Sequence, residues 1–342
     1  MRYQLRYVRI IPAGANWPPA CSAFQNCSRS CPPGKLAYPD RPHATHRKSQ
    51  RHGGRRPCQA APCASVDDVA VWMNGELYRD DEARISIFDH GLVVGDGVFE
   101  TIKVTDGQPF ALTRHLARLA RSAAGLGIPA PDLDAIRDGA LAVIEASPRV
   151  PLARMRITVT AGVGPLGSER GGSALTAIVA LAGQPSPAAF VDVSVVPWPR
   201  NERGALSGLK TTSYGENVRA LAYAAEHGGS EAIFGNTAGD LCEGTGTNIF
   251  VVLDGRLITP PLTAGCLAGV TRALVIEWFE AAEENVKLGD LSNAEEAFLT
   301  GTTRDVQSIR NVNGLKLPVS PGPITRKAAD VFAMRAAESP DP

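Results

Sequence analysis

Short apolar stretches separated by two-residue polar turns recur along the chain from residue 69 onward. Three of them are candidate β-hairpins, with Asn74-Gly75, Asp106-Gly107 and Asp254-Gly255 at their turns. Asparagine, aspartate and glycine accept the positive φ angles of the type I′ turn that joins tightly paired strands. Further strands are predicted over residues 156–160 and 191–196. This part of the chain should therefore be rich in β-sheet.

Helical periodicity alternates with these strand signals. Leucines and alanines recur every three or four positions over residues 112–126, which predicts a helix with one apolar face. Arg114, Arg118 and Arg121 fall on the polar side of that helix. The same reasoning predicts four more helices, over residues 132–146, 217–227, 271–284 and 326–337.

Strands and helices mix in both halves of this region, so we expect a mixed α/β (α+β) fold with two domains. A chain of 342 residues is long enough for two domains. The Pro-rich stretch at residues 184–187 is where we place a linker. It would separate a smaller domain, residues 69–184, from a larger one, residues 188–338.

The first 65 residues have a different composition. They contain eleven Lys or Arg, a single acidic residue, Asp40, and five of the seven cysteines. No period of two or 3.6 is sustained there. We interpret residues 1–68 as a disordered basic extension, or as sequence translated from upstream of the true start, with a transit peptide as an alternative. No metal site is predicted, because the cysteine spacings fit no zinc pattern.

The remaining sequence is acidic overall, which gives no electrostatic basis for binding nucleic acid. No apolar run is long enough to span a membrane. Cys242 and Cys266 are the only cysteines left in this part, which suggests a reducing, cytoplasmic environment rather than a disulfide scaffold.

Lys210 is the most informative residue of the chain because two distinctive turns come after it in the sequence. Glu243 opens a Gly- and Thr-rich turn, and a second turn at residues 269–272 reads Gly-Val-Thr-Arg. A lysine can form a Schiff base with an aldehyde, a carboxylate can hold a ring nitrogen, and such turns offer N–H and hydroxyl groups to a phosphate. This set of groups is what pyridoxal 5′-phosphate needs.

Two other motifs do not carry chemistry in this interpretation. Gly162-x-Gly164-x-x-Gly167 matches a dinucleotide fingerprint, but no amphipathic helix follows it, so we predict a loop. Asp89 and His90 are adjacent, and adjacent side chains on extended backbone point apart, so a structural role is preferred.

The motifs resemble class IV pyridoxal-phosphate enzymes, which include branched-chain and D-amino-acid aminotransferases and aminodeoxychorismate lyases. The resemblance spans residues 69–335, with Gly-Asp-Gly-Val-Phe-Glu-Thr at residues 95–101 as the signature of the first domain. It implies a two-domain fold with the cofactor between the domains, and a homodimer. It also implies a Schiff-base role for Lys210, and cofactor contacts from Arg118, Tyr214, Glu243, Val270, Thr271 and Thr302.

The reaction is less closely defined by this resemblance. The signature is closer to the lyase and D-amino-acid branches, so the first hypothesis is conversion of 4-amino-4-deoxychorismate to 4-aminobenzoate and pyruvate. The alternative is an aminotransferase for a branched-chain or D-amino acid with a 2-oxo acid acceptor. A third, less favoured hypothesis is a cofactor-binding protein without catalysis.

Three residues are assigned to the small-molecule amine substrate. Arg156 and the weaker candidate Arg154 could hold its carboxylate, and Glu100 lies within the signature. The alternative for both arginines is a salt bridge at a strand edge. Ala161 stands where the D-amino-acid branch carries an arginine, which argues against that activity.

Overall fold

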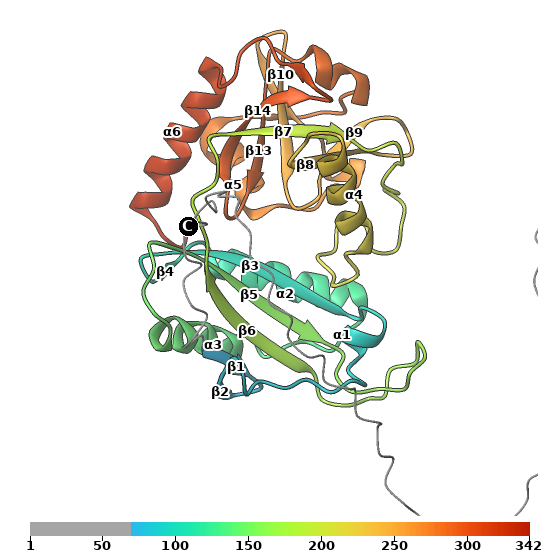
Figure 1. Cartoon of the computed structure of the whole chain (residues 1–342), viewed down its shortest axis with the longest axis vertical. Helices are drawn as coiled ribbons and strands as arrows, with labels where there is room; N and C mark the ends of the chain where they lie inside the picture. The colour runs from blue at the N-terminus through green and yellow to red at the C-terminus, as the bar shows by residue number, and fades with distance from the viewer. Residues whose placement is uncertain (1–69) are drawn as a thin grey trace, which may run out of the picture. The chain divides into compact units, whose positions relative to one another are not determined.

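The computed structural model describes residues 70–342 (Figure 1). The predictions made for residues 1–68 therefore lie outside the described residues. Over residues 70–342, strands and helices mix in both halves, and the predicted mixed α/β fold class is confirmed. None of the helices in this range combines the length and the apolar character needed to cross a bilayer.

A six-stranded antiparallel sheet, in the order β2-β1-β6-β5-β3-β4, forms the first lobe. Its strands are β1 (Ala70–Met73), β2 (Glu76–Arg79), β3 (Gly97–Thr105), β4 (Gln108–Pro109), β5 (Leu152–Thr160) and β6 (Thr176–Gly183). The hairpin turns predicted at Asn74-Gly75 and Asp106-Gly107 are confirmed, and all four residues have positive φ. The turns therefore set the register of β1 with β2 and of β3 with β4.

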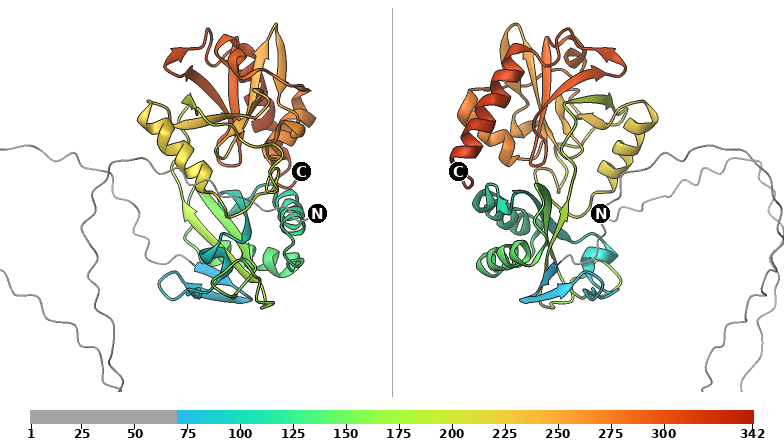
Figure 2. Two further views of the ribbon diagram at one scale, coloured as in Figure 1. Left: turned by 90° about the vertical axis from the view of Figure 1, so that its right-hand side faces the viewer. Right: turned by 60° about the vertical axis from the view of Figure 1, so that its left-hand side comes forward.

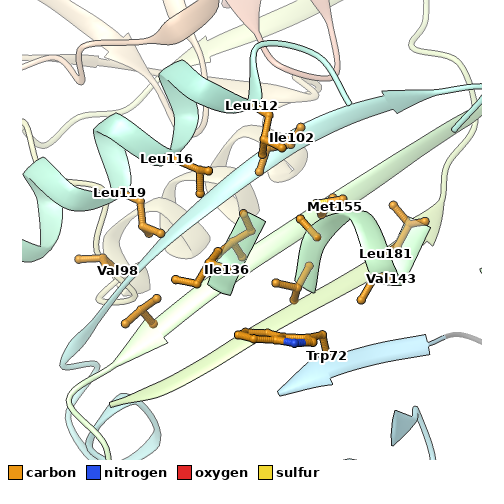
Figure 3. Close-up of a cluster of buried hydrophobic side chains, with 14 of the residues drawn as sticks. Trp72, Val98, Ile102, Leu112, Leu116, Leu119, Ile136, Val143, Met155 and Leu181 are labelled. Carbon is orange, nitrogen blue, oxygen red and sulfur yellow. The ribbon is translucent and has the colours of Figure 1, made fainter. Parts of the chain in front are cut away.

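Helices α2 (Leu112–Leu126) and α3 (Leu133–Ala146) cover one face of this sheet (Figures 1 and 2). Side chains such as Trp72, Ile102, Leu119, Ile136 and Met155 fill the space between helices and sheet (Figure 3). Because side chains alternate along a strand, the neighbours of the inward residues point to the opposite, open face. The sequence therefore places β5 residues 154, 156 and 158 on that open face.

A nine-stranded mixed sheet forms the second lobe, with the order β12-β11-β10-β13-β14-β7-β8-β9 and β15 beside β14. The strands are β7 (Phe190–Val195), β8 (Glu231–Gly235), β9 (Leu241–Gly244), β10 (Asn248–Leu253), β11 (Arg256–Thr259), β12 (Ala282–Glu283), β13 (Glu296–Gly301), β14 (Asp305–Val312) and β15 (Leu315–Lys316). The third predicted hairpin, at Asp254-Gly255, joins β10 to β11. Short 3₁₀ helices span Leu262–Ala264 and Leu288–Asn293.

Three helices pack on the second sheet: α4 (Gly215–Glu226), α5 (Val270–Phe279) and α6 (Pro323–Glu338). The predicted helix over residues 271–284 was too long at its C-terminal end. Glu280 adopts a left-handed conformation with φ of 54° and ends α5. The following Ala282–Glu283 pairs with β11 instead. The helical periodicity of the sequence could not show that residues 282–283 join the edge of the second sheet.

Residues 184–189 connect β6 to β7, and the domain boundaries drawn there stay a prediction. Backbone contacts join the two lobes elsewhere. Phe99 N–H donates to the carbonyl of Lys210 at 3.0 Å, and Val98 forms a β-bridge with Thr211. The Lys103 ammonium also lies 2.6 Å from the Asp305 carboxylate. The segment that carries Lys210 is thereby attached to β3 of the first sheet.

Asp89 and His90 have the structural role expected for them. Asp89 caps α1 (His90–Val93) by accepting from Gly91 N–H, and it also accepts from the hydroxyl of Thr160. The His90 ring lies near Asp96 instead, at 3.3 Å. The glycine-rich stretch at residues 162–167 is part of the connection between β5 and β6, without a helix, as predicted.

The N-terminus of α2 is capped from a distant part of the chain. Ala111 precedes the helix in a left-handed conformation and provides no side-chain cap. Instead, the Asp341 carboxylate accepts from Thr113 N–H at 2.9 Å. Arg114 Nε donates to the carbonyl of Pro342 at 2.8 Å. Residues 340–342 therefore stabilise the helix that carries Arg118.

We expect the substitution Asp341→Ala to lower the free energy of unfolding by about 1 kcal/mol, because it removes an N-terminal cap. Urea denaturation followed by circular dichroism measures this change. Asp341→Asn should recover part of the loss, since its amide oxygen can still accept. Asp330→Ala, which removes an exposed aspartate of α6, is the control, and a loss no larger than in this variant would contradict the capping role.

Candidate active site

Lys210 lies in a buried segment between the two lobes, with only 8% of its surface exposed. Its Nζ lies 4.4 Å from the centroid of the Phe99 ring and 5.8 Å from that of Tyr214. The two rings pack edge to face. Burial, with a contribution from the nearby Arg118 guanidinium, lowers the pKa of Lys210 from 10.5 to about 8. A substantial fraction of this amine is therefore neutral near pH 8 and able to act as a nucleophile or base.

Arg118 does not point to solvent with Arg114 and Arg121, and that part of the prediction was wrong. It is 5% exposed, and its Nε and Nη2 donate to the two oxygens of Glu100 at 2.8 and 2.7 Å. Its Nη1 donates to the carbonyl of Ala268 in the second lobe at 3.1 Å. The carboxylate supplied by β3 explains the orientation, because a buried guanidinium requires a partner.

Glu100 has a different place from the one predicted. It is fully buried on the helix-facing side of β3 and lies outside the cavity lining described below. Besides Arg118, it contacts His115 Nδ1 at 2.7 Å. Although burial opposes ionisation, Arg118 and His115 lower the pKa of Glu100 from 4.5 to about 2. The structure thus places Glu100 against Arg118 and outside the cavity, whereas the sequence-based assignment put it at the substrate.

Glu243 is the second buried carboxylate of the site. Arg200 Nη1 donates to its Oε1 at 2.8 Å, and Leu267 N–H donates to its Oε2 at 2.9 Å. Burial raises the pKa of Glu243, and the charge of Arg200 opposes that rise. Sequence reasoning missed Arg200, since no motif marks the Pro-rich segment in which it stands. Asn217, which accepts from Arg200 at 2.9 Å, was missed for the same reason.

One cavity of about 350 Å³ collects most of the predicted residues. Its lining includes the predicted catalytic and cofactor-binding residues: Arg118, Lys210, Tyr214, Glu243, Val270, Thr271 and Thr302. Groups more than 30 residues apart in the sequence, such as Lys210 and Glu243, therefore face the same space. Arg154, Arg156 and Glu100 are outside this lining.

The cavity wall also contains polar groups without a partner. The hydroxyls of Thr247 and Thr300 are buried, and neither has a hydrogen-bond partner among the residues described. Helix α5 begins at Val270, and its N-cap, Gly269, offers no side-chain cap. A Cβ at residue 269 would lie 2.0 Å from the Asn248 amide oxygen, so this close turn needs glycine. The free N–H groups and hydroxyls suit a phosphate.

These groups fit pyridoxal phosphate. The cavity offers an amine of lowered pKa for an aldehyde, a carboxylate for a ring nitrogen, and a guanidinium with free N–H groups for a phosphate. The buried Thr247 and Thr300 hydroxyls further indicate that a polar ligand completes the site, because unpaired buried polar groups are costly.

The two arginines that the sequence assigned to the substrate, Arg154 and Arg156, lie in different places on the open face of β5. The Arg156 guanidinium stacks on the Phe99 ring, with 3.8 Å from Cζ to the centroid, and donates to Thr158 at 3.1 Å. Arg154 instead lines a separate cavity of about 480 Å³ with Thr303 and Arg304. Within residues 70–342 neither arginine forms an ion pair. The strand-edge salt bridge offered as the alternative is therefore not formed among residues 70–342.

Comparisons with known proteins agree with this geometry. The family described as amino-transferase class IV matches residues 97–312. A putative branched-chain-amino-acid aminotransferase of Methanocaldococcus jannaschii is 34% identical over 279 residues, covering 77% of this chain and 95% of the relative. A D-alanine aminotransferase of Staphylococcus haemolyticus is 28% identical over 285 residues, covering 77% of this chain and 96% of the relative. The crystal structure of the Escherichia coli branched-chain aminotransferase superposes with a TM-score of 0.72 at 27% identity, covering 78% and 94%.

The chain belongs to the class IV aminotransferase family. It is accordingly an enzyme that depends on pyridoxal phosphate, as the sequence motifs predicted. The relatives just named are aminotransferases, and they give no support to the narrower lyase-like assignment.

We expect Glu100→Gln to lower the free energy of unfolding at neutral pH by about 3 kcal/mol, because it leaves Arg118 buried without its charge partner. The folded-state pKa of Glu100 is depressed, so its contribution is complete above about pH 4.5 and is lost as the pH falls toward 2. Chemical denaturation of the cofactor-free protein at several pH values tests this. A variant with the wild-type pH slope in that window would contradict it.

Proposed function

We propose that this enzyme is an aminotransferase that moves the amino group of an amino acid to a 2-oxo acid. The observation that carries the proposal is the placement of Lys210 and Glu243 on one cavity, with the lysine amine held at a lowered pKa. The relatives named above are aminotransferases for branched-chain amino acids or D-alanine, which supports the alternative in our sequence-based hypotheses over the lyase.

Four groups would hold the phosphate of the cofactor. Arg118 offers the N–H groups that Glu100 and Ala268 leave free, and Val270 and Thr271 offer the uncapped amides of α5. Thr302, from the turn between β13 and β14, would add a hydroxyl. Helix N-termini favour anions because of their free N–H groups and the helix dipole. The phosphate would therefore be bound by both lobes.

Pyridoxal phosphate, when bound, supplies an aldehyde carbon that combines with amines and a pyridine ring that accepts electrons. Glu243 would accept a hydrogen bond from the ring N–H, and Arg200 favours the ionised carboxylate needed for this. Burial raises the pKa of Tyr214 to about 12, so its hydroxyl stays protonated and can donate to the phenolic oxygen of the cofactor. Both contacts orient the ring.

Lys210 would bind the cofactor covalently at rest and then move protons. Its Nζ, once released, can take a proton from the substrate Cα and deliver it elsewhere on the bound molecule. A pKa of about 8 suits this exchange, since a base works best when its pKa is near the working pH. Phe99 packs beside the amine.

Arg156 is our preferred group for the substrate carboxylate. Its guanidinium and the Lys210 amine contact the same ring, Phe99, so a carboxylate bound there would lie on the lysine side of the site. Arg154 lines the second cavity described above and is the alternative group for the substrate carboxylate. Ala161, 7% exposed, offers no charge at the position where the D-amino-acid branch has an arginine. This favours branched-chain donors over D-alanine.

We also propose that the enzyme is a homodimer, as its family resemblance implies. Exposed apolar side chains gather on two adjacent segments of the first lobe: Ile87 and Leu92 are 72% and 62% exposed, and Leu166 is 69% exposed. The segments are joined by a hydrogen bond from Gly164 N–H to the Phe88 carbonyl at 3.0 Å. Exposed apolar side chains on adjoining segments are typical of an interface. A second copy of the chain would cover it.

The loaded enzyme should form glutamate from 2-oxoglutarate with L-leucine, L-isoleucine or L-valine as donor. Lys210→Ala should lower the rate by about 10³-fold or more, because the proton-transfer group is removed. Lys316→Ala, at an exposed lysine of β15, should keep full activity. D-Alanine and 4-amino-4-deoxychorismate are assayed in parallel. Formation of 4-aminobenzoate without any transamination would overturn the proposal in favour of the lyase.

Light scattering on a sizing column should give wild-type enzyme twice the mass of its 36.1 kDa chain. The double variant Ile87→Asp with Leu92→Asp should elute as a monomer, because it places charges in the apolar contact. Leu315→Asp, at a leucine that is 65% exposed in the second lobe, should stay dimeric. A monomeric wild type would refute the proposed dimer, and a dimeric double variant would refute this interface.

A further inference from the structure

Glu231, the first residue of β8, is a buried carboxylate that contacts Thr245 in the cavity wall and Arg304, two residues after Thr302 of the same wall. Only 2% of its surface is exposed. Its Oε1 accepts from Thr245 N–H at 3.0 Å, from the Thr245 hydroxyl, and from Ala232 N–H at 3.1 Å. Its Oε2 lies 3.2 Å from Nη2 of Arg304. One side chain therefore joins the turn that comes after Glu243 to the turn between β13 and β14.

The first of these turns is held from both sides. The Thr245 carbonyl accepts from the amide of Asn217, which in turn accepts from Arg200, the partner of Glu243. Thr245 itself lines the cavity. A continuous series of polar contacts therefore runs from Glu243 to Glu231.

The second turn is short and depends on Arg304. Its backbone closes with a hydrogen bond from Arg304 N–H to the Gly301 carbonyl at 3.0 Å, and Thr302 lies between them. Besides Glu231, the Arg304 guanidinium contacts Gln307 at 2.8 Å. Within the described residues, Glu231 is the carboxylate paired with this arginine. The position of Thr302 is therefore tied to β8, a strand from another part of the second sheet.

We propose that Glu231 is a positioning residue that fixes the distance between the two ends of the cofactor site. Through Thr245 it sets the turn beside the ring end, and through Arg304 it sets the Thr302 turn at the phosphate end. The proposal rests on the cofactor placement given under the proposed function. A buried carboxylate with all its partners satisfied holds them in one geometry, whereas a partly satisfied one leaves them free to shift.

The substitution Glu231→Gln separates the two functions of the side chain. The amide oxygen can still accept from Thr245, but the amide nitrogen is a donor and cannot pair with Arg304. Calorimetric titration of the cofactor-free full chain should show pyridoxal phosphate binding about tenfold more weakly, with pyridoxal weakened less than about threefold. The difference is expected because only the phosphorylated compound reaches the Thr302 turn.

Arg304→Gln should give the same selective loss, and the double variant should lose no more than either single variant, since both changes break one contact. Glu296→Gln is the matched control. Glu296 is similarly buried, at 4% exposed, but accepts from the first N–H groups of α6 and does not line the cavity. The Glu296→Gln variant should show the same relative change in affinity for pyridoxal phosphate and for pyridoxal. This holds even if the variant unfolds at a lower temperature than the wild type.

Equal losses for pyridoxal phosphate and pyridoxal, additive losses in the double variant, or the same discrimination in Glu296→Gln would each overturn the assignment. The titrations need no turnover. A wild-type protein that binds pyridoxal phosphate but transfers no amino group would therefore count against the aminotransferase proposal and leave this test intact.

Discussion

The attachment of the Lys210 segment to the edge of β3 is the constraint on which the site depends. The Phe99 N–H donates to the Lys210 carbonyl, and Thr212 N–H donates to Gly97 at 2.8 Å, so residues of the second lobe extend the first sheet. Side chains alternate on β3, and its two neighbouring residues therefore serve opposite faces. Phe99 packs against the lysine amine, while Glu100 holds Arg118 on the helix side.

Charge around this strand is arranged so that the buried lysine stays without a counterion. Arg118 is paired with Glu100, and Arg200 with Glu243. Lys210 is as buried as these groups, yet no carboxylate within the described residues pairs with it. The lowered pKa of the lysine results from this arrangement, because its protonated form is poorly solvated and has the Arg118 cation nearby. The pairing of the other charges is what leaves a reactive amine.

Local signals in the sequence were sufficient for helices α2 to α6, for three hairpins and for seven of the residues that line the cavity. The Asn-Gly and Asp-Gly turns and the leucine period of α2 depend on neighbours in the chain, and they were predicted well. Arg118 was assigned to the cofactor from its motif, but its burial depends on Glu100, which lies 18 residues away on a strand. Arg200 and Glu231 act through partners far along the chain, so no local pattern marks them. The prediction of where α5 ends was wrong for the same reason, because the pairing of Ala282–Glu283 with β11 decides where the helix stops.

Arg118 has a further consequence for how the cofactor would enter. A guanidinium carries five N–H groups, and Glu100 and Ala268 already engage three of them. Its rotamer is thus chosen before any ligand arrives, and ordering this long side chain costs no conformational entropy at the moment of binding. A phosphate that binds there would therefore meet a guanidinium that is already held in place.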